Sequence, residues 1–311
     1  MSPIPWQRLK RPLAYVGLGV FAFFVFLFLT FPYSTLTQRI SMAAQEAGFT
    51  VTLGSLGPGF FGVTAKHVEL SRAEPPAANA PPSTPLKIDS LSLRPSLWPL
   101  GVALRASALG GTVHAVVGGM GDASVHVSIS GLDFSKGNFK GFTGVDLVGG
   151  LNGELSLDIP SVAAAPNGGP KTPDLSQASG LFTLALDNCT VRGGTATVPL
   201  YGQMTPIDLP RLKLGNLDAA IRFDKGAGTV ERLTGVNGDL DLIVTGTLKL
   251  ARQLLYSETN LQVKLKPTPE LMKNGFVGMG ISALPPDPSN PGFRGARVTG
   301  LLGSPAFQPG S

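Results

Sequence analysis

The glycine-rich segment Gly57–Gly62 is the stretch of the chain whose spacing most resembles a chemical site. Its glycines at positions 57, 59 and 62 match a dinucleotide-binding loop, in which backbone N–H groups at the start of a helix hold a pyrophosphate. Residues 63–70, however, have the pattern of a strand and not of a helix. We therefore interpret the segment as a glycine-rich turn between two strands, and we predict no cofactor.

The chain has three histidines, His67, His114 and His126, and one cysteine, Cys189. None of the histidines has a Cys, Asp or Glu near it at a spacing typical of metal ligands. We interpret them as strand residues and predict no metal site, although His114 and His126 could meet across a hairpin. A single cysteine excludes an intramolecular disulfide, so Cys189 is expected to be a small buried apolar residue.

Catalytic motifs do not stand in a supporting context anywhere in the sequence. We find no nucleophile elbow, P-loop, zinc-binding helix or paired carboxylates, and the protein is predicted not to be an enzyme. The net charge of +5 comes from 25 basic and 20 acidic residues that are spread along the chain. Without a basic stripe, nucleic acid is not an expected partner. The 40 glycines and 27 prolines indicate many turns and short strands.

The segment 13–31 carries no charged side chain, and about 20 apolar residues are enough to cross a bilayer as a helix. We predict a transmembrane helix over 13–31 after a tail over 1–12. Inner-membrane lipid is then a partner of the anchor residues, which are Leu13, Phe21, Phe24, Phe28 and Phe31. The basic residues Arg8, Lys10 and Arg11 precede the segment, which keeps the N-terminus in the cytoplasm and exports residues 32–311.

A cleaved signal peptide is the alternative to this anchor. The apolar region of a signal peptide is about 7 to 15 residues long and ends at a small-x-small cleavage site, whereas this segment is followed by Phe31-Pro32-Tyr33-Ser34. After it, residues 34–47 show apolar residues at helical spacing before Gly48. They predict a short amphipathic helix that lies on the membrane or covers the first strands, and its small apolar face favours the second option.

From Phe49 onward the apolar period changes to two. Val125, Val127 and Ile129 alternate with polar residues, as do Phe182, Leu184 and Leu186. The same pattern recurs at 86–88, 155–159, 212–214, 217–223, 240–244, 248–250 and 261–265, with turn residues between the runs. Short connections between strands predict an all-β domain built as an antiparallel meander, with curved or sandwiched sheets.

Three proline-rich stretches interrupt this pattern, at 75–85, 160–173 and 285–291. We interpret them as loops or mobile insertions. The second divides the β region into two plausible halves, but none is long enough to establish a domain boundary. One further helix is predicted around Pro269–Asn274.

As a whole, the order of features resembles the type II secretion system protein N family of bacteria. The features are a basic tail, an apolar span, Phe31-Pro32, a short helix and many glycine-punctuated strands, including the run Leu151–Leu157 and the similar run Thr245–Leu250. The C-terminal segment Val298–Phe307 also resembles the endings of AsmA-like repeat proteins of the bacterial envelope. The proline-rich insertions depart from the secretion-family pattern.

The first resemblance implies a non-catalytic accessory component of the type II protein secretion system. It would be anchored in the inner membrane by one span, with a periplasmic β domain and other envelope proteins of the secretion system as partners. The AsmA-like resemblance implies a second role, in which an apolar groove of a curved sheet binds or transfers phospholipid.

Physical arguments from the sequence do not decide between these two functions. An antiparallel sheet with one apolar face must cover that face with another sheet, a helix, a partner or a lipid. We name Leu242, Val244 and Leu248 as members of this face. The many Gly and Ala residues on the strands favour a sealed core between two closely spaced sheets.

Overall fold

The computed structural model describes residues 49–59, 62–72, 84–143, 145–163, 171–200, 203–273 and 275–310, together with six residues between 37 and 45. The strands are β1 (Phe49–Gly59), β2 (Gly62–Arg72), β3 (Leu86–Leu97), β4 (Leu100–Ala108), β5 (Gly111–Gly118), β6 (Ala123–Asp133), β7 (Val145–Ile159), β8 (Ser161–Ala163), β9 (Lys171–Pro173), β10 (Ser179–Leu200), β11 (Gln203–Leu209), β12 (Leu212–Asp224), β13 (Ala227–Val236), β14 (Leu240–Lys249), β15 (Glu258–Pro267), β16 (Arg294–Leu301) and β17 (Ser304–Pro309). The helical segments are η1 (Phe134–Lys136), α3 (Phe139–Thr143), η2 (Leu175–Gln177), η3 (Leu254–Tyr256), α4 (Pro269–Met272) and α5 (Gly275–Ser282).

All of these strands except the β8–β9 hairpin belong to one sheet. Its order is β1-β2-β3-β4-β5-β6-β7-β10-β12-β13-β14-β15-β16-β17, with β11 paired to β10, and every neighbouring pair is antiparallel. The prediction of a mostly antiparallel β protein with few helices is therefore confirmed. The sandwich of two sheets is not what the described residues form.

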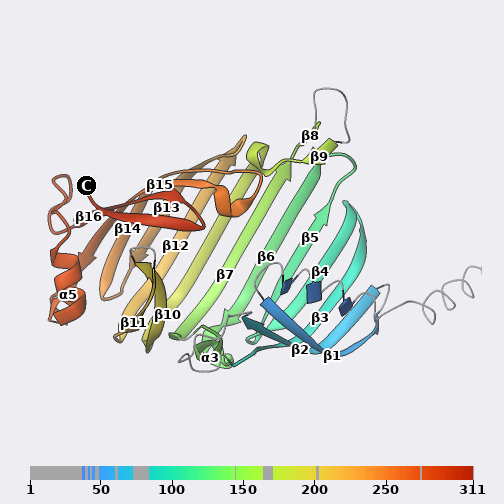
Figure 1. Cartoon of the computed structure of the whole chain (residues 1–311), viewed down its shortest axis with the longest axis horizontal. Helices are drawn as coiled ribbons and strands as arrows, with labels where there is room; N and C mark the ends of the chain where they lie inside the picture. Colours follow the sequence, from blue (N-terminus) through green and yellow to red (C-terminus); the bar gives the residue numbers. More distant parts are fainter. Residues whose placement is uncertain are drawn as a thin grey trace, which may run out of the picture.

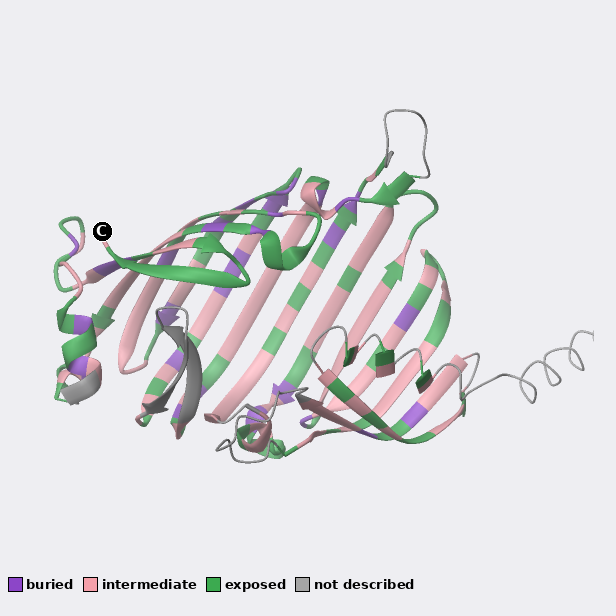
Figure 2. Cartoon of the chain, in the orientation of Figure 1, coloured by how far each residue is buried: buried purple, intermediate pink, exposed green. Residues whose placement is uncertain are grey.

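The sheet is bent into a trough. In Figure 1 the last strands, β15–β17, come forward of β12–β14, and the first strands, β1 and β2, also lie in front. Along β7 the polar residues Asn152, Glu154 and Ser156 are exposed, whereas Leu155 is half-buried and Leu157 is buried. Among the described residues no second sheet covers these apolar side chains, so we place them on the concave side, where the neighbouring strands shield them. Figure 2 shows this alternation of exposed and half-buried residues along the middle strands.

Two rims bound the trough where the strands end. The upper rim consists of the turns at 98–99, 119–122 and 225–226 and of the segments 250–257 and 302–303. The lower rim consists of the turns at 109–110 and 237–239, of η1 and α3, and of α4 and α5. Strands β5 and β7 point to the upper rim in Figure 1. The chain enters the sheet at the lower rim, where Phe49 pairs with Arg72.

Most of the helical predictions can be compared with the structure. The described residues of 34–47, namely 37, 38, 41, 42, 44 and 45, are helical. The predicted helix at Pro269–Asn274 is α4, where the Thr268 side chain accepts a hydrogen bond from the Leu271 N–H. Helix α5 was not predicted, because three of its eight residues are glycines, which disfavour helix. Gly278 lets α5 approach α4 closely, since a Cβ there would lie 2.4 Å from the Met272 carbonyl oxygen.

Two of the proline-rich stretches are more ordered than we predicted. Within 160–173, strands β8 and β9 pair as a short hairpin. The loop 285–291 is held by Asp287, whose carboxylate accepts hydrogen bonds from the Ser289 N–H and the Asn290 amide and lies 2.7 Å from the Lys264 ammonium. The stretch 285–291 is therefore a loop, as one of the two interpretations had it, and Asp287 holds it to β15. Of the stretch 75–85, only residues 84 and 85 lie within the described chain.

The residues predicted to anchor and orient the chain, over 1–31, lie outside the described residues. Among the helices that are described, none is both long and apolar enough to cross a bilayer.

Candidate functional site

The apolar face of the trough is a continuous row of side chains that crosses the sheet from strand to strand. In the middle of the sheet, Val127 lies opposite Ala115 and Leu155, Leu155 lies opposite Phe182, and Phe182 lies opposite Ile221. The strands on either side continue the row with the pairs Leu104–Ala115, Leu93–Leu104, Val63–Leu93, Val244–Val263, Leu261–Val298 and Val298–Phe307. Cross-strand register thus joins the separate sequence patterns into one surface.

The three residues that the sequence named for this face lie on it together. Leu242 pairs with Leu265, Val244 with Val263, and Leu248 with Thr259, all on β15. On the other side, Leu242 and Leu248 lie opposite Gly235 and Gly228 of β13, which have no side chains. Val244 is buried, with 6 % of its surface exposed, whereas Leu242 and Leu248 are half-buried. This part of the face is therefore partly open to solvent.

Two clusters of buried side chains close parts of the trough at its rims. The upper-rim cluster contains Leu157, Ile159, Ala178, Phe223 and Leu250, with Leu175 of η2 packed against it. The lower-rim cluster contains Leu109, Leu132 and Phe134, with Phe139 of α3 packed against it. Val127, Leu155, Phe182 and Ile221 in the middle of the sheet are only half-buried, and the last three pack against the upper-rim cluster. Other buried apolar residues, such as Val68, Val230 and Val244, belong to the same single sheet, so the described residues do not form the sealed core that we expected between two sheets.

Short capped turns position η1 and η2 at the two clusters. The Asp133 carboxylate accepts hydrogen bonds from the N–H and the hydroxyl of Ser135, at 2.9 and 2.6 Å. Asp174 accepts the same two bonds from Ser176, at 3.0 and 2.7 Å. The serine hydroxyls are the main cause of the lowered pKa of each carboxyl group. We did not predict these caps from the sequence, although both turns have the same short motif, Asp-apolar-Ser.

Additional contacts tie the two turns into the fold. Arg252 Nε donates to Asp174 Oδ2 at 3.0 Å, which joins η2 to the segment after β14. The Gly226 N–H donates to the Ala178 carbonyl oxygen, and a Cβ at Gly226 would lie 2.0 Å from the Ser176 carbonyl oxygen. On the lower rim, Phe142 of α3 stacks on Phe49 of β1, with ring centroids 6.3 Å apart. The positions of both turns are therefore fixed by packing as well as by their caps.

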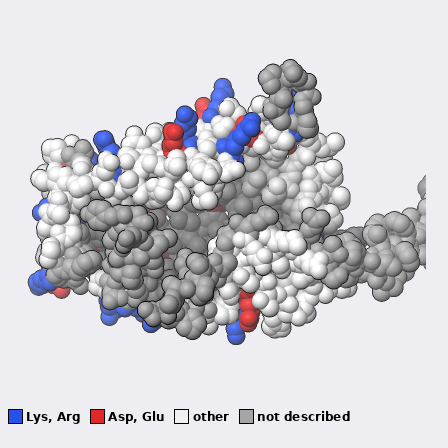
Figure 3. Space-filling view, in the orientation of Figure 1, with Lys and Arg blue, Asp and Glu red and all other residues white. Residues whose placement is uncertain are grey.

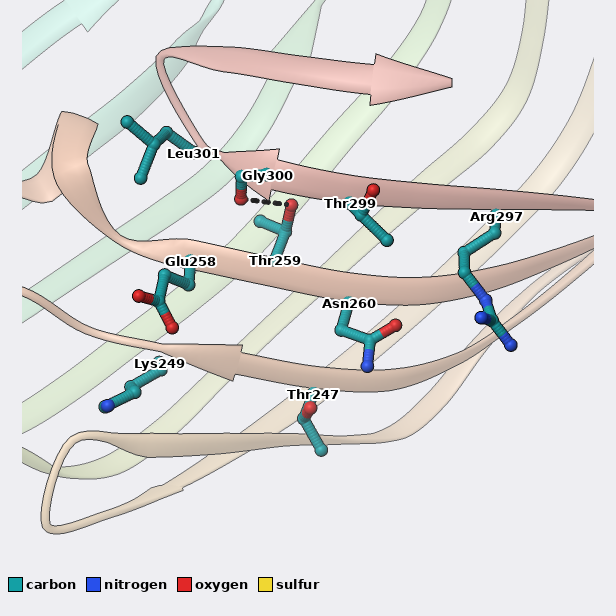
Figure 4. A pocket seen from close by; sticks show the side chains of 9 residues that line it. All are labelled: Thr247, Lys249, Glu258, Thr259, Asn260, Arg297, Thr299, Gly300 and Leu301. Carbon is teal, nitrogen blue, oxygen red and sulfur yellow. Dashed lines mark hydrogen bonds between the residues drawn. The ribbon is translucent and has the colours of Figure 1, made fainter. Parts of the chain in front are cut away.

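The other face of the sheet is polar, and a hollow on it has a volume of about 660 Å³. Figure 4 shows its lining on β14–β16, where Thr247, Asn260 and Thr299 form one cross-strand row. Lys249 and Glu258 are opposite each other at one end, and Arg297 lies at the other. The lining contains one carboxylate and no histidine or cysteine, so it offers neither a metal-ligand set nor a nucleophile with a base.

The residues first considered for chemistry do not come together in the structure. Strand β1 ends at Gly59 and β2 begins at Gly62, and the two glycines are opposite each other, so the glycine-rich segment joins two antiparallel strands and does not lead into a helix. His126 lies opposite Val116, and His114 lies opposite Ser128, so the two histidines are not a cross-strand pair. Cys189 is buried as expected, with 1 % exposure, and burial raises the pKa of its thiol.

Most of the charged side chains of the described residues lie on the polar face of the sheet or at its rims. In the face shown in Figure 3, most of the Lys, Arg, Asp and Glu side chains in view lie along the upper and lower margins.

Comparison with known proteins gave no further information on this face. No family model, curated protein or solved structure matched the chain.

Proposed function

We propose that the protein is an envelope protein that binds lipid acyl chains along the apolar face of its trough. The observation that carries this proposal is the row of half-buried aliphatic and aromatic side chains that continues across the sheet, from Val63 on β2 to Val298 on β16. An apolar surface of this extent is costly to leave in water, at about 25 cal/mol per Å².

A lipid chain fits this surface better than a polar ligand does. The face supplies Leu, Val, Ile and Phe side chains, whereas charged residues such as Glu154, Arg222 and Arg297 lie on the other face of the sheet. Acyl chains gain about 0.8 kcal/mol for each buried CH₂ group without needing hydrogen-bond partners. A phospholipid could therefore place its chains in the trough and its headgroup at a charged rim.

Native mass spectrometry of the full-length protein, exchanged into a lipid-free detergent, tests this proposal. We expect bound phospholipid on the wild-type protein and less on a Leu242→Asn, Leu248→Asn double variant. The matched control is Thr245→Asn with Thr247→Asn, which changes the polar face of the same strand. Equal phospholipid on all three proteins would contradict the proposal, because adventitious lipid around a membrane anchor does not depend on these residues.

A structural role in the type II secretion system is the second proposal. It is supported by the resemblance of the whole chain and by the edge strand β1, which pairs only with β2 within the described residues. A partner protein could add a strand to this edge. Crosslinking in cells that recovers secretion-system envelope proteins through β1, and not through β7, would support this role. Recovery of the same proteins through both strands would argue against it.

A further inference from the structure

Exposed apolar side chains gather on the upper rim of the trough. The first group, which we call the lip, lies at the turns β3–β4 and β5–β6 and consists of Leu97, Trp98, Leu100, Val102, Val117 and Met120. Trp98 is 96 % exposed, and Met120 is 89 % exposed. Single exposed apolar residues are common on protein surfaces, but a contiguous group marks an interaction site.

The lip is continuous with the apolar face. Val102 pairs with Val117, which pairs with Val125, and both Val102 and Val117 are about half exposed, at 46 % and 49 %. At the opposite end of the same strands, the lower rim is closed by Phe134 and Phe139. In this half of the molecule the trough is therefore covered at the lower rim and leads to exposed apolar residues at the upper rim.

A second apolar group lies on the same rim, at the turns that join β14–β15 and β16–β17. It consists of Leu254, Leu255, Tyr256 and Leu302, which are all exposed. Between the two groups, the turn between β12 and β13 is polar, with Asp224 and Lys225. Two separate apolar tips on one rim fit an extended apolar layer better than they fit a single compact partner.

Both tips have the composition and the backbone bonding that entry into lipid requires. Each combines aliphatic residues with one amphipathic aromatic residue, Trp98 or Tyr256, of the kind found at membrane interfaces. Polar backbone groups must be satisfied within the protein before they leave water. The Leu100 carbonyl oxygen accepts from the Gly119 N–H, and the Leu255 carbonyl oxygen accepts from the Gly303 N–H, at 3.0 and 2.9 Å.

The charged residues next to the two apolar tips also suit contact with anionic lipid headgroups. Residues 97–102 and 117–121 contain no charged side chain, and Arg94 and Arg105, on the strands behind the lip, are exposed. Arg252 precedes the second tip and is also exposed, but its guanidinium is paired with the Asp174 carboxylate, so Arg94 and Arg105 supply the attraction to anionic headgroups. The Asp122 carboxylate next to the lip accepts a hydrogen bond from the Ser161 N–H. Basic residues just behind an apolar tip attract anionic headgroups.

From these observations we infer that the lip docks on the surface of a lipid bilayer and inserts Trp98 at its interface. This inference goes beyond the proposed function, because docking does not depend on whether the trough holds a lipid. Where both hold, the lip is the place at which acyl chains pass between the bilayer and the trough.

The experiment uses tryptophan fluorescence of the full-length protein. The chain has two tryptophans, so Trp6→Phe leaves Trp98 as the reporter. The protein is reconstituted into vesicles of phosphatidylcholine with some phosphatidylglycerol. The experiment has two arms, which differ in where phosphatidylcholine with brominated acyl chains is placed. In the first arm it is in the vesicles that contain the protein, and in the second arm it is in vesicles that are added separately. Docking predicts that Trp98 is quenched by the brominated lipid in at least one arm and is protected from aqueous iodide.

Matched variants test which surface of the protein contacts the lipid and causes the quenching of Trp98. Leu97→Ser with Leu100→Ser should remove most of the quenching, whereas Val236→Ser with Met279→Ser, which changes exposed residues near the lower rim, should leave it unchanged. Circular dichroism checks that each variant keeps its strand content. Docking is refuted if Trp98 is not quenched in either arm, or if both pairs of variants act alike. Protection from iodide without lipid quenching would also refute it and would indicate a protein contact.

Discussion

The apolar face can be mapped by placing a carboxylate at successive positions of β14. Val244→Asp removes a side chain that is 6 % exposed, which loses about 1.5–2 kcal/mol of apolar burial. The unpartnered carboxylate adds about 1–3 kcal/mol. We expect a total loss of about 2.5–5 kcal/mol in the free energy of unfolding. Thr245→Asp, on the exposed polar face of the same strand, should change it by less than about 0.5 kcal/mol.

The half-buried positions of the same face give the more informative result. At Leu242 and Leu248, water can reach an introduced carboxylate, so we expect Leu242→Asp and Leu248→Asp to cost only about 1–2 kcal/mol each. Urea unfolding of the purified protein at constant detergent concentration, followed by far-UV circular dichroism, measures all four variants. Equal losses of several kcal/mol at 242, 244 and 248 would refute an open trough. If Thr245→Asp lowered the free energy of unfolding as much as Val244→Asp, the assignment of Val244 to the apolar face of β14 and of Thr245 to its polar face would be refuted.

Three other predictions concern the parts that hold the trough together. Phe223→Ala, in the upper-rim cluster, should lower the free energy of unfolding by about 3 kcal/mol in the same urea assay; a loss below about 1 kcal/mol would mean that the cluster does not close the rim. Lys264 holds the pKa of Asp287 at about 2, below the unfolded value of about 3.9. Its stabilisation is therefore present above about pH 4 and is lost as the pH falls towards 2, and Asp287→Asn should flatten the urea midpoint between pH 6 and 3, whereas an unchanged pH dependence would contradict this. Cys189 is buried and burial raises the pKa of its thiol, so a maleimide should label it only after unfolding, as measured by mass spectrometry; rapid labelling of the folded protein would contradict the structure.

The alternation of residues on single strands was sufficient to predict the fold class and the members of the apolar face. Leu242, Val244 and Leu248 share a face because a strand has a period of two, and Gly246 between them continues the same strand with a φ of 134°. The sequence analysis had separated 240–244 from 248–250 at this glycine. A glycine is compatible with either a turn or a continuing strand, and only the pairing with β15 decides between them.

Local patterns left open whether the strands form one curved sheet or two sheets packed face to face. Small residues such as Gly180 and Gly228 lie on the apolar face, and we took such residues as evidence for two closely packed sheets. In the structure, Gly180 separates Leu157 from Phe223 and lets them pack in one cluster, while a Cβ at Gly228 would lie 2.6 Å from the Phe223 ring. The same residues therefore serve packing within one bent sheet.

The exposed lip and the capped turns were missed for a different reason. A turn such as Leu97–Leu100 has no periodicity, and its exposure depends on where the neighbouring turns lie. The Asp-apolar-Ser motif at 133–135 and 174–176 is short, and its role becomes clear only when η1 and η2 are seen at opposite rims.

Site-specific photo-crosslinking in living cells tests the central claim most directly. The photoreactive residue p-benzoylphenylalanine is placed at Leu248 on the apolar face or at its neighbour Thr247 on the polar face, in cells whose phospholipids carry radioactive phosphate. If acyl chains occupy the trough, phospholipid should become attached to the protein at position 248 and not at 247. No labelling at 248, or equal labelling at both positions, would contradict a lipid-binding trough.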